Sequence, residues 1–502
     1  MNATTTLSST RYADWKAPTD DGELLIWPGP RELVAHTREN HRALASCTAP
    51  VQGVPLRELR AAARRWIGHE ADDQPIVATG HQAELYHPGV WVKHAMINAV
   101  ARAVGGQAYQ LAVDTDAPKH LHLRYPGGSL PVTDDPRLAR APWTGLVDGP
   151  TPGHIAEIEA EFATASRGWG FTPCVGEFLG SLRRTALEAH ELAPAVVNAT
   201  HQLDWRLGMR HHAMLLSPVW ASPAFLVYAH DLLARGGEVA ANYNAALAGY
   251  RVEQGIKSPG RPMPDLAVRE GEVESPFWLD DLATGTRRRL TLSKSGSAWR
   301  MGEFVLDAST DGHAAAEKLL AHLRLHNLRL APRALTLTMF LRLFLADQFV
   351  HGIGGGRYDQ VTDRLIHALY GIQPPAFSVT TATLYFPAAA GQKRVSLRPL
   401  LQEGRRLRHG SFSREKRAMA DAIAGLPRNS AERRTAFFDM HRWLARQADS
   451  NAMRAWQEQL DHATAEQLKQ KAVFDRELFY AIQPEERLRG LIARYDAQFD
   501  RV

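Results

Sequence analysis

A histidine and a glutamine follow the first strongly apolar run of the chain. Residues 75–78 are apolar, the run breaks at Gly80, and His81 and Gln82 come next. A neutral imidazole at a strand end can hydrogen-bond a phosphate or transfer a proton near pH 7. We therefore take His81 as a candidate catalytic residue, and Gly80 and Gln82 as candidate substrate-binding residues. The structural alternative is a loop histidine whose hydrogen bonds are made within the protein.

Two carboxylates follow the next apolar run, 109–113. Asp114 and Asp116 are two residues apart, so at a strand end their side chains would point to the same side. Such a pair suits an amino group, a ribose hydroxyl pair or a Mg²⁺-bound nucleotide, and we take both as candidate catalytic residues. Alternatively, one of them caps the segment that begins at Pro118. His120, a little further along, is a candidate substrate-binding residue.

A glycine-rich segment near residue 350 is the second candidate site. It lies between an apolar run, 334–350, and a helical pattern, 359–370. Glycines ahead of a helix N-terminus can present backbone N–H groups to a phosphate or carboxylate, although glycines also serve in plain helix termination and tight turns. The candidate anion- or nucleotide-binding residues here are His351, Gly352, Gly354, Gly355, Gly356 and Arg357.

Lys93 stands about one turn into the helix expected between the first two strands. Its ammonium group either points toward an anion in the crevice, which makes it a candidate substrate-binding residue, or faces solvent. Neither nucleotide-binding fingerprint, GxxxxGK[ST] or GxGxxG, follows the first strand. The histidines of this region lack a metal-binding spacing such as HExxH, so we predict no metal site.

The candidate residues between Gly80 and His120 belong to a strand–helix–strand unit. The apolar pattern at 90–104 has helical length and stops at Gly105, so residues 74–122 have the order of a βαβ unit, which is parallel with a right-handed crossover. In open parallel sheets ligands bind beyond the carboxyl ends of the strands. The sequence therefore predicts an α/β protein with a small-molecule site in this crevice.

The patterns along the chain predict three parts. Residues 1–60 would form an arm and a helix, 61–402 an α/β core, and 403–502 a helical hairpin or coiled-coil region. Within the core, residues near 275–305 alternate apolar and polar, as a small antiparallel insertion would.

Two further segments of the core have apolar patterns. Residues 195–199 have the composition of another strand. Residues 334–350 are apolar on nearly every face, which predicts a largely buried helix.

Composition and charge exclude several classes of protein, among them nucleic-acid-binding, disulfide-rich and membrane proteins. The chain has 502 residues, 45% hydrophobic and 23% charged, which is ordinary for a globular protein with two or three domains. A formal net charge of +5 is a mild bias toward anionic ligands and too small to argue for nucleic acid. Cys47 and Cys174 stand in unlike contexts and indicate no disulfide framework. With no signal-peptide pattern and no uncharged spanning run, we expect a cytoplasmic protein with no membrane partner.

Two stretches resemble the cysteine-adding enzymes of bacillithiol biosynthesis. Residues 79–83 (TGHQA), with Pro88 and Gly89 opening a helix, are similar to that family's TGQQ…GP segment. Residues 330–333 (LAPR), followed by a buried helix and an Ile-Gly-Gly sequence, are similar to its later LRP…GG segment. The acidic strand end at 114–120 is similar in position, although its letters differ.

The resemblance implies a Rossmann-like parallel-sheet core, a helical coiled-coil region, a cytoplasmic homodimer and nucleotide binding, with ATP or ADP as the expected ligand. Carried over residue by residue, it reaches Gly80, Gln82, Gly89, Gly354 and Gly355. His81 stands where the family has Gln, and the sequence GGGRYD departs from the family's GGP-acidic pattern. Both departures lie at the expected site, so they bear on the identity of the substrate.

The sequence and the resemblance together predict a ligase-like enzyme that acts on small molecules. It would join a cysteine-like amino acid to the amine of a small anionic, sugar-type acceptor. One alternative is a nucleotidyl-transfer enzyme on the same fold, which would cleave ATP to AMP or transfer AMP. Another is a non-catalytic scaffold or binding protein assembled through its helical hairpin.

Overall fold

The largest sheet of the computed structural model is mostly parallel and has the strand order β1-β2-β17-β16-β5-β6-β9. Residues 5–6, 15–70, 73–409, 413–447, 450–500 and 502 are described. The pairs from β17 to β9 are all parallel, whereas β2 and β17 are antiparallel. The bounds are β1 Thr5–Thr6, β2 Leu24–Trp27, β5 Ile76–Gln82, β6 Gln107–Val113, β9 His212–Leu215, β16 Gln348–His351 and β17 Phe377–Ala382.

The chain divides into two compact units, one of residues 1–384 with 476–502 and one of residues 385–475. The sequence placed a boundary at residue 402 and assigned the whole C-terminus to the helical region. Instead, the last helix, α16 (Glu485–Phe499), belongs to the first unit and contacts α3 (Pro88–Val104).

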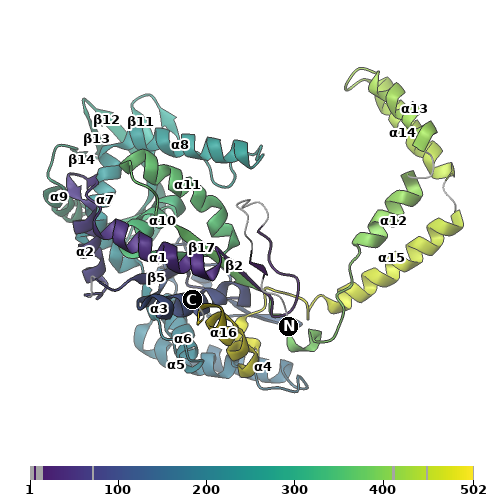
Figure 1. The fold of residues 1–502 in the computed structure, drawn as a ribbon, viewed down its shortest axis with the longest axis horizontal. Helices are drawn as coiled ribbons and strands as arrows, with labels where there is room; N and C mark the ends of the chain where they lie inside the picture. The colour runs from purple at the N-terminus through teal and green to yellow at the C-terminus, as the bar shows by residue number, and fades with distance from the viewer. Residues whose placement is uncertain (1–4, 7–14, 71–72, 410–412, 448–449, 501) are drawn as a thin grey trace. The chain divides into compact units, whose positions relative to one another are not determined.

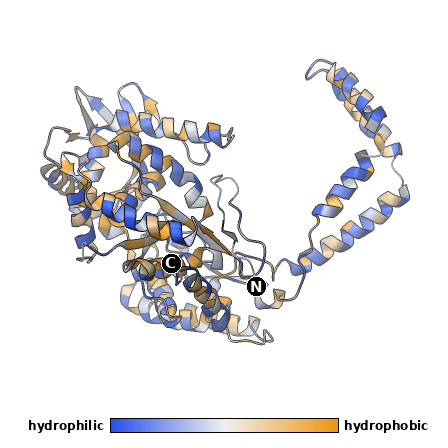
Figure 2. Cartoon of the chain, viewed as in Figure 1, coloured by the Kyte–Doolittle hydropathy of each residue, from blue (hydrophilic) through white to orange (hydrophobic). Residues whose placement is uncertain are grey.

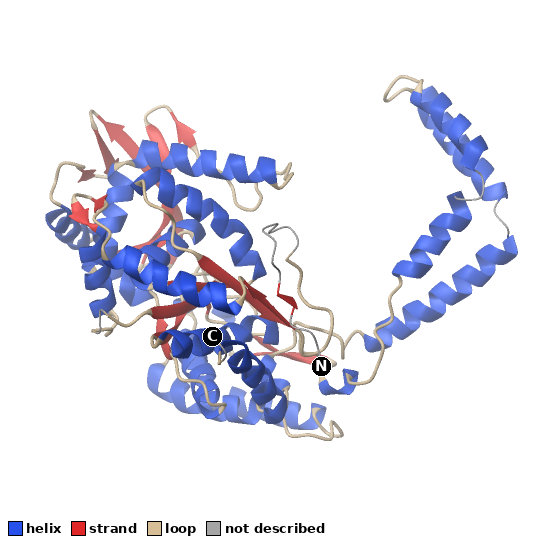
Figure 3. Cartoon of the chain, viewed as in Figure 1, coloured by secondary structure: helices blue, strands red, loops and turns tan. Residues whose placement is uncertain are grey.

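Helices cover the main sheet in the first unit (Figures 1 and 3). The helix α3 contacts β5, β6 and β17, and α11 (Ile353–Tyr370) contacts β16 and β17. The other α-helices described in this unit, besides α16, are α1 Pro30–Ala45, α2 Leu56–Trp66, α4 Pro152–Ala165, α5 Val175–Ala189, α6 Leu192–Arg206, α7 Pro223–Ala234, α8 Gly236–Glu253, α9 Gly312–Leu325 and α10 Ala334–Phe340.

The expected β5–α3–β6 unit is present, and the local sequence explains where α3 begins and ends. His87 is the N-cap of α3: its Nδ1 accepts a hydrogen bond from the backbone N–H of Gly89 at 3.1 Å, and Pro88 occupies the first turn. Gly105 ends the helix in the left-handed conformation, with φ of 69°. The predicted break at Gly80 is wrong, because β5 continues through His81 to Gln82. The TGHQ sequence is therefore the end of the strand itself.

Three other expectations fail in instructive ways. Residues 195–199 are not a strand but part of α6. The apolar run 334–350 is not a single helix: α10 passes into a π-helical turn, Leu341–Leu345, and the run ends in the buried strand β16. A fully buried parallel strand and a fully buried helix have the same apolar sequence, so periodicity could not separate them. Gly354, Gly355 and Gly356 are not a loop but the first turn of α11.

A large cluster of buried apolar side chains packs on one face of the sheet in the first unit. Alternate residues of the strands, such as Ile76 and Ala78 in β5 and Tyr109 and Leu111 in β6, pack there with α7, α10 and α11. The central strands are correspondingly hydrophobic in Figure 2.

The predicted antiparallel insertion near 275–305 is confirmed as a second sheet. Its strands are ordered β10-β11-β12-β13-β14, with β15 on the other side of β11. Their bounds are β10 Val268–Arg269, β11 Glu272–Asp281, β12 Thr286–Ser295, β13 Ala298–Met301, β14 Phe304–Leu306 and β15 Leu328–Pro332. Two small hairpins pair β3 Pro50–Val51 with β4 Val54–Pro55, and β7 His122–Tyr125 with β8 Gly128–Pro131.

The second unit is helical. In it α13 (Ser413–Ala424) contacts α14 (Ala431–Gln447), and α12 (Arg398–His409) contacts α15 (Ser450–Gln470). Ile423, Met440 and Leu444 form a small apolar cluster between α13 and α14. Among the described residues of the chain, no helix is long and apolar enough to cross a membrane.

Candidate functional site

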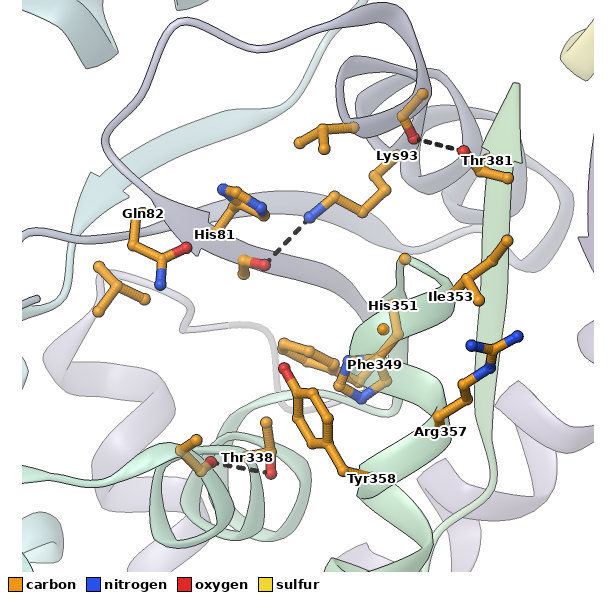
Figure 4. A pocket seen from close by; sticks show the side chains of 18 of the residues that line it. His81, Gln82, Lys93, Thr338, Phe349, His351, Ile353, Arg357, Tyr358 and Thr381 are labelled. Carbon is orange, nitrogen blue, oxygen red and sulfur yellow. Dashed lines mark hydrogen bonds between the residues drawn. The ribbon is translucent and has the colours of Figure 1, made fainter. Parts of the chain in front are cut away.

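A cavity of about 660 Å³ lies where the strands β5 and β16 end (Figure 4). It is bounded by the ends of these strands, the first turns of α3 and α11, and part of α10. Such a volume suits a metabolite-sized ligand. The two predicted candidate regions, near residues 80–120 and 351–357, therefore meet in one site. The predicted site residues that line it are Gly80, His81, Gln82, Lys93, Asp116, His351, Gly352, Gly354, Gly355 and Arg357.

The N-terminus of α11 forms one end of the cavity. Gly352 is its N-cap, and the first intrahelical hydrogen bond runs from Gly356 N to Gly352 O at 3.0 Å. The backbone N–H groups of Ile353, Gly354 and Gly355 precede that bond, so the helix itself offers them no acceptor. Together with the positive end of the helix dipole, they suit a carboxylate or phosphate group.

Beneath this helix end lies a buried charge network. His351 Nε2 donates to Asp359 Oδ2 at 2.8 Å, and Arg342 Nη1 donates to the same oxygen at 2.7 Å. Burial alone would raise the pKa of Asp359, but Arg342 and His351 lower it well below its usual range. The carboxylate is therefore ionised and fixes the His351 ring at the cavity wall.

His81 occupies the opposite wall, at the end of β5. Its Nδ1 lies 3.4 Å from Oε2 of Glu84, a residue that the sequence analysis did not select. Burial, and to a lesser degree Lys93, holds the pKa of His81 well below its usual value. Burial raises the pKa of Glu84 to about 7. A neutral imidazole beside a carboxyl group that is half protonated near pH 7 can exchange protons with a substrate. The only signal for Glu84 in the sequence was its place three residues after His81.

Lys93 extends from α3 toward the strand end, as Figure 4 shows. The side chain is 2% exposed and Nζ donates to the carbonyl oxygen of Gly80 at 3.1 Å. Burial lowers the pKa of Lys93 to about 7. The residue thus points into the crevice, and the alternative of a solvent-facing lysine is wrong.

The two predicted aspartates have separate environments. Asp116 lines the cavity and accepts a hydrogen bond from Gln82 Nε2 at 2.9 Å. Asp114 is 4% exposed, does not line the cavity, and accepts from the backbone N–H of Ser217 at 2.9 Å. Burial raises its pKa. Asp114 therefore does not cap the segment that begins at Pro118, because its partner is Ser217, two residues after the end of the neighbouring parallel strand β9.

His120 and Gly356 also lie outside the main cavity. His120 borders a neighbouring cavity of about 150 Å³, which shares His81, His87 and Glu477 with the larger one and is also lined by Glu84. A Cβ atom added at Gly356 would lie 2.3 Å from a methyl group of Val379. Gly356 therefore allows close packing of α11 against β17.

A buried histidine–aspartate cluster includes His94 of α3. His94 Nδ1, Asp204 and His211 offer ligand atoms that all lie within 4.8 Å of one another. However, Asn98 Oδ1 accepts from the backbone N–H of Arg210 at 2.5 Å, so its amide nitrogen donates to His211 Nδ1 at 3.1 Å. The proton of neutral His211 is then on Nε2, 3.5 Å from Asp204.

A protonated nitrogen cannot bind a metal ion, so the cluster is better described as a hydrogen-bond network. Asp204 also accepts from Trp91 Nε1 and from His94 Nδ1, both at 2.7 Å. These bonds join α3 to α6. No local sequence pattern indicates this cluster, because its members are far apart along the chain.

No protein-family model matches the chain, and no curated protein sequence matches it significantly.

Proposed function

We propose that the chain is a ligase-like enzyme that joins a cysteine-like amino acid to the amine of a small anionic, sugar-type acceptor. The observation that carries the proposal is the shared cavity: His81 and Gln82 at the end of β5 line it together with the N-terminus of α11. Proton-transfer groups at one wall and an anion site at the other are what such a reaction needs.

A Rossmann-like core is part of this proposal. In chain order the parallel strands are β5, β6, β9, β16 and β17, and in space they run β9-β6-β5-β16-β17. Numbered by sequence this is the order 3-2-1-4-5, in which the direction of winding reverses between β5 and β16. Ligands in such sheets bind at that reversal, which supports the assignment of the cavity as the active site.

The anionic groups of the substrates would bind at α11. A carboxylate or phosphate would accept hydrogen bonds from Ile353, Gly354 and Gly355, with the Arg357 guanidinium nearby on the same helix turn. An amide bond formed from a carboxylate and an amine releases water, so ATP would supply the driving force. ATP or ADP is the ligand that we expect at this end of the cavity.

The acceptor amine would lie near His81. Glu84 is 4% exposed and borders the smaller cavity, where a carboxylate would hold an ammonium group until it loses its proton. His81 lines both cavities and would therefore lie between the amine and the anion site. Its neutral form would accept the proton when the amine attacks.

A thermal-shift screen tests the proposal. We expect ATP or ADP, cysteine and amino sugars to raise the melting temperature, each because it binds only the folded protein. Gly355→Ala should weaken the nucleotide shift and Glu84→Gln the amino-sugar shift, each selectively. No shift with any of these compounds contradicts the proposal and favours the scaffold alternative.

Nucleotidyl transfer remains a second candidate, because the N-terminus of α11 suits a phosphate as well as a carboxylate. In that reaction His81 would contact phosphate oxygens. Analysis of the products of ATP separates the two functions: AMP transferred to an acceptor supports nucleotidyl transfer, and an amide product supports ligation. The homodimer, the coiled-coil character of the second unit and the cytoplasmic location stay predictions.

A further inference from the structure

Lys93 is a buried amine that the proposed ligation does not use. Its side chain is 2% exposed, and the hydrogen bond of Nζ is to a neutral backbone carbonyl, Gly80 O. Among the described residues, no aspartate or glutamate forms an ion pair with it. Burial disfavours the charged ammonium form more than the nearby Glu84 carboxylate stabilises it, so the pKa of Lys93 falls to about 7.

The position of Lys93 makes this amine available to a ligand. Nζ lies at the end of β5 on the wall of the 660 Å³ cavity, with His81 beside it (Figure 4). The N-terminus of α11 lines the same cavity from the β16 side. A molecule that carries an anionic group at α11 can therefore reach toward Lys93 with another group.

We propose that Lys93 is the attachment point for a carbonyl substrate, and that it forms an imine with an aldehyde or 2-oxo acid whose anionic group binds at the N-terminus of α11. A desolvated lysine in a cavity is the usual nucleophile for imine formation. This activity is separate from the proposed ligation and does not depend on it.

The step balances without another reactant. The lone pair of Nζ attacks the carbonyl carbon, and the proton that leaves nitrogen goes to the former carbonyl oxygen, which gives a carbinolamine. Loss of that hydroxyl group with the second nitrogen proton releases water and leaves a C=N bond. His81 and Glu84, which lie at the same strand end, are the groups that can carry these protons.

Reductive trapping tests the proposal. The full-length protein would be mixed with pyridoxal 5′-phosphate, which has an aldehyde and a phosphate group, and then reduced with borohydride and mapped by peptide mass spectrometry. Lys16 serves as the internal control, because it lines the same cavity but is exposed. At pH 7 we expect Lys93 to be labelled at least tenfold faster than Lys16.

The pH profile gives a second readout. Since the pKa of Lys93 is lowered to about 7 by burial, its labelling should rise through pH 7 and level off by about pH 8. An exposed lysine gains reactivity up to about pH 10, where its amine loses its proton. Pyridoxal without the phosphate should label Lys93 at least fivefold more slowly than the phosphate ester, and inorganic phosphate should compete.

Three results would overturn the proposal. Lys93 could remain unlabelled, it could react no faster than Lys16, or pyridoxal 5′-phosphate could bind without an adduct, which would make Lys93 a counter-ion for anions. Lys93→Arg should abolish labelling at this position, while Lys16→Arg should not affect it. Because peptide mapping of the unchanged protein already compares the two lysines, the test holds even if Lys93→Arg fails to fold. It also holds if no ligation is found.

Discussion

His351 Nε2 donates a hydrogen bond to Asp359 Oδ2 at 2.8 Å across the first two turns of α11. Asp359 is fully buried and also accepts from Arg342, so one carboxylate links the strand β16, the helix α11 and the π-helical turn after α10. The ion pair between Asp359 and Arg342 therefore stabilises the end of α11 that faces the cavity. Both the stability of this helix end and the orientation of His351 should depend on Asp359.

Asp359→Asn should destabilise the first unit by about 3–5 kcal/mol, because it leaves the Arg342 guanidinium buried without its main counter-charge. Urea unfolding followed by far-UV circular dichroism measures this change. Asp363→Asn is the matched control: Asp363 also pairs with Arg342, at 2.6 Å, but its side chain is 34% exposed. That change should cost less than about 1 kcal/mol. Equal losses in the two variants would contradict the assignment of Asp359 as the main partner.

The strand–helix–strand unit around His81 could be predicted because its signals are local. In the β5–α3–β6 segment, two short apolar runs of strand length flank one apolar run of helical length. A proline stands at the start of the helix and Gly105 at its end. The strand β16 was missed for the opposite reason. It is buried on both faces, with all four residues hidden, and only two residues separate it from the buried helical turn before it, which ends at Leu345. No glycine or proline marks the boundary, and Asp347, which stands there, is itself buried.

The site was predictable only in part. His81, Gln82 and Asp116 could be selected because polar residues at the ends of parallel strands meet at one edge of a sheet. Asp114 has the same signal, yet its carboxylate serves Ser217, a partner more than 100 positions away that no local pattern indicates. Glu84 was missed because its significance comes from burial, which raises its pKa.

His81→Ala should abolish formation of the ATP-dependent amide product while leaving the melting temperature within about 2 °C of the original. The side chain is 28% exposed and its Nδ1 lies 3.4 Å from Glu84 Oε2, beyond a short hydrogen bond, so little folding energy depends on it. Product analysis by mass spectrometry and a thermal melt measure the two effects. His367→Ala, an exposed histidine on α11, should change neither. A large loss of stability in His81→Ala would assign His81 a structural role.

Glu84 should make stability depend on pH between about 4.5 and 7. Its pKa is raised by burial to about 7, so the folded protein binds the proton more tightly than the unfolded chain does. The contribution is full below pH 4.5 and is lost as pH rises through 7. Between pH 4.5 and 8 the unaltered protein should lose about 3 kcal/mol relative to Glu84→Gln.

Urea titrations at several pH values measure this difference. Glu188→Gln, which replaces an exposed glutamate on α5, should follow the unaltered protein at every pH. If Glu84→Gln also follows it, the carboxyl group is ionised at neutral pH, and its proposed part in proton transfer fails.

Gly354→Ala and Gly355→Ala should have opposite effects on stability, although they are adjacent in the first turn of α11. A Cβ atom at Gly354 meets no other atom within 4 Å, whereas one at Gly355 would lie 2.7 Å from His351 Nδ1. Alanine at 354 should therefore stabilise the helix by about 0.5–1 kcal/mol. Alanine at 355 should displace the imidazole and weaken its bond to Asp359, at a cost of about 2 kcal/mol. Unfolding in urea measures both, and a gain in stability for Gly355→Ala would mean that His351 is not held against the helix end.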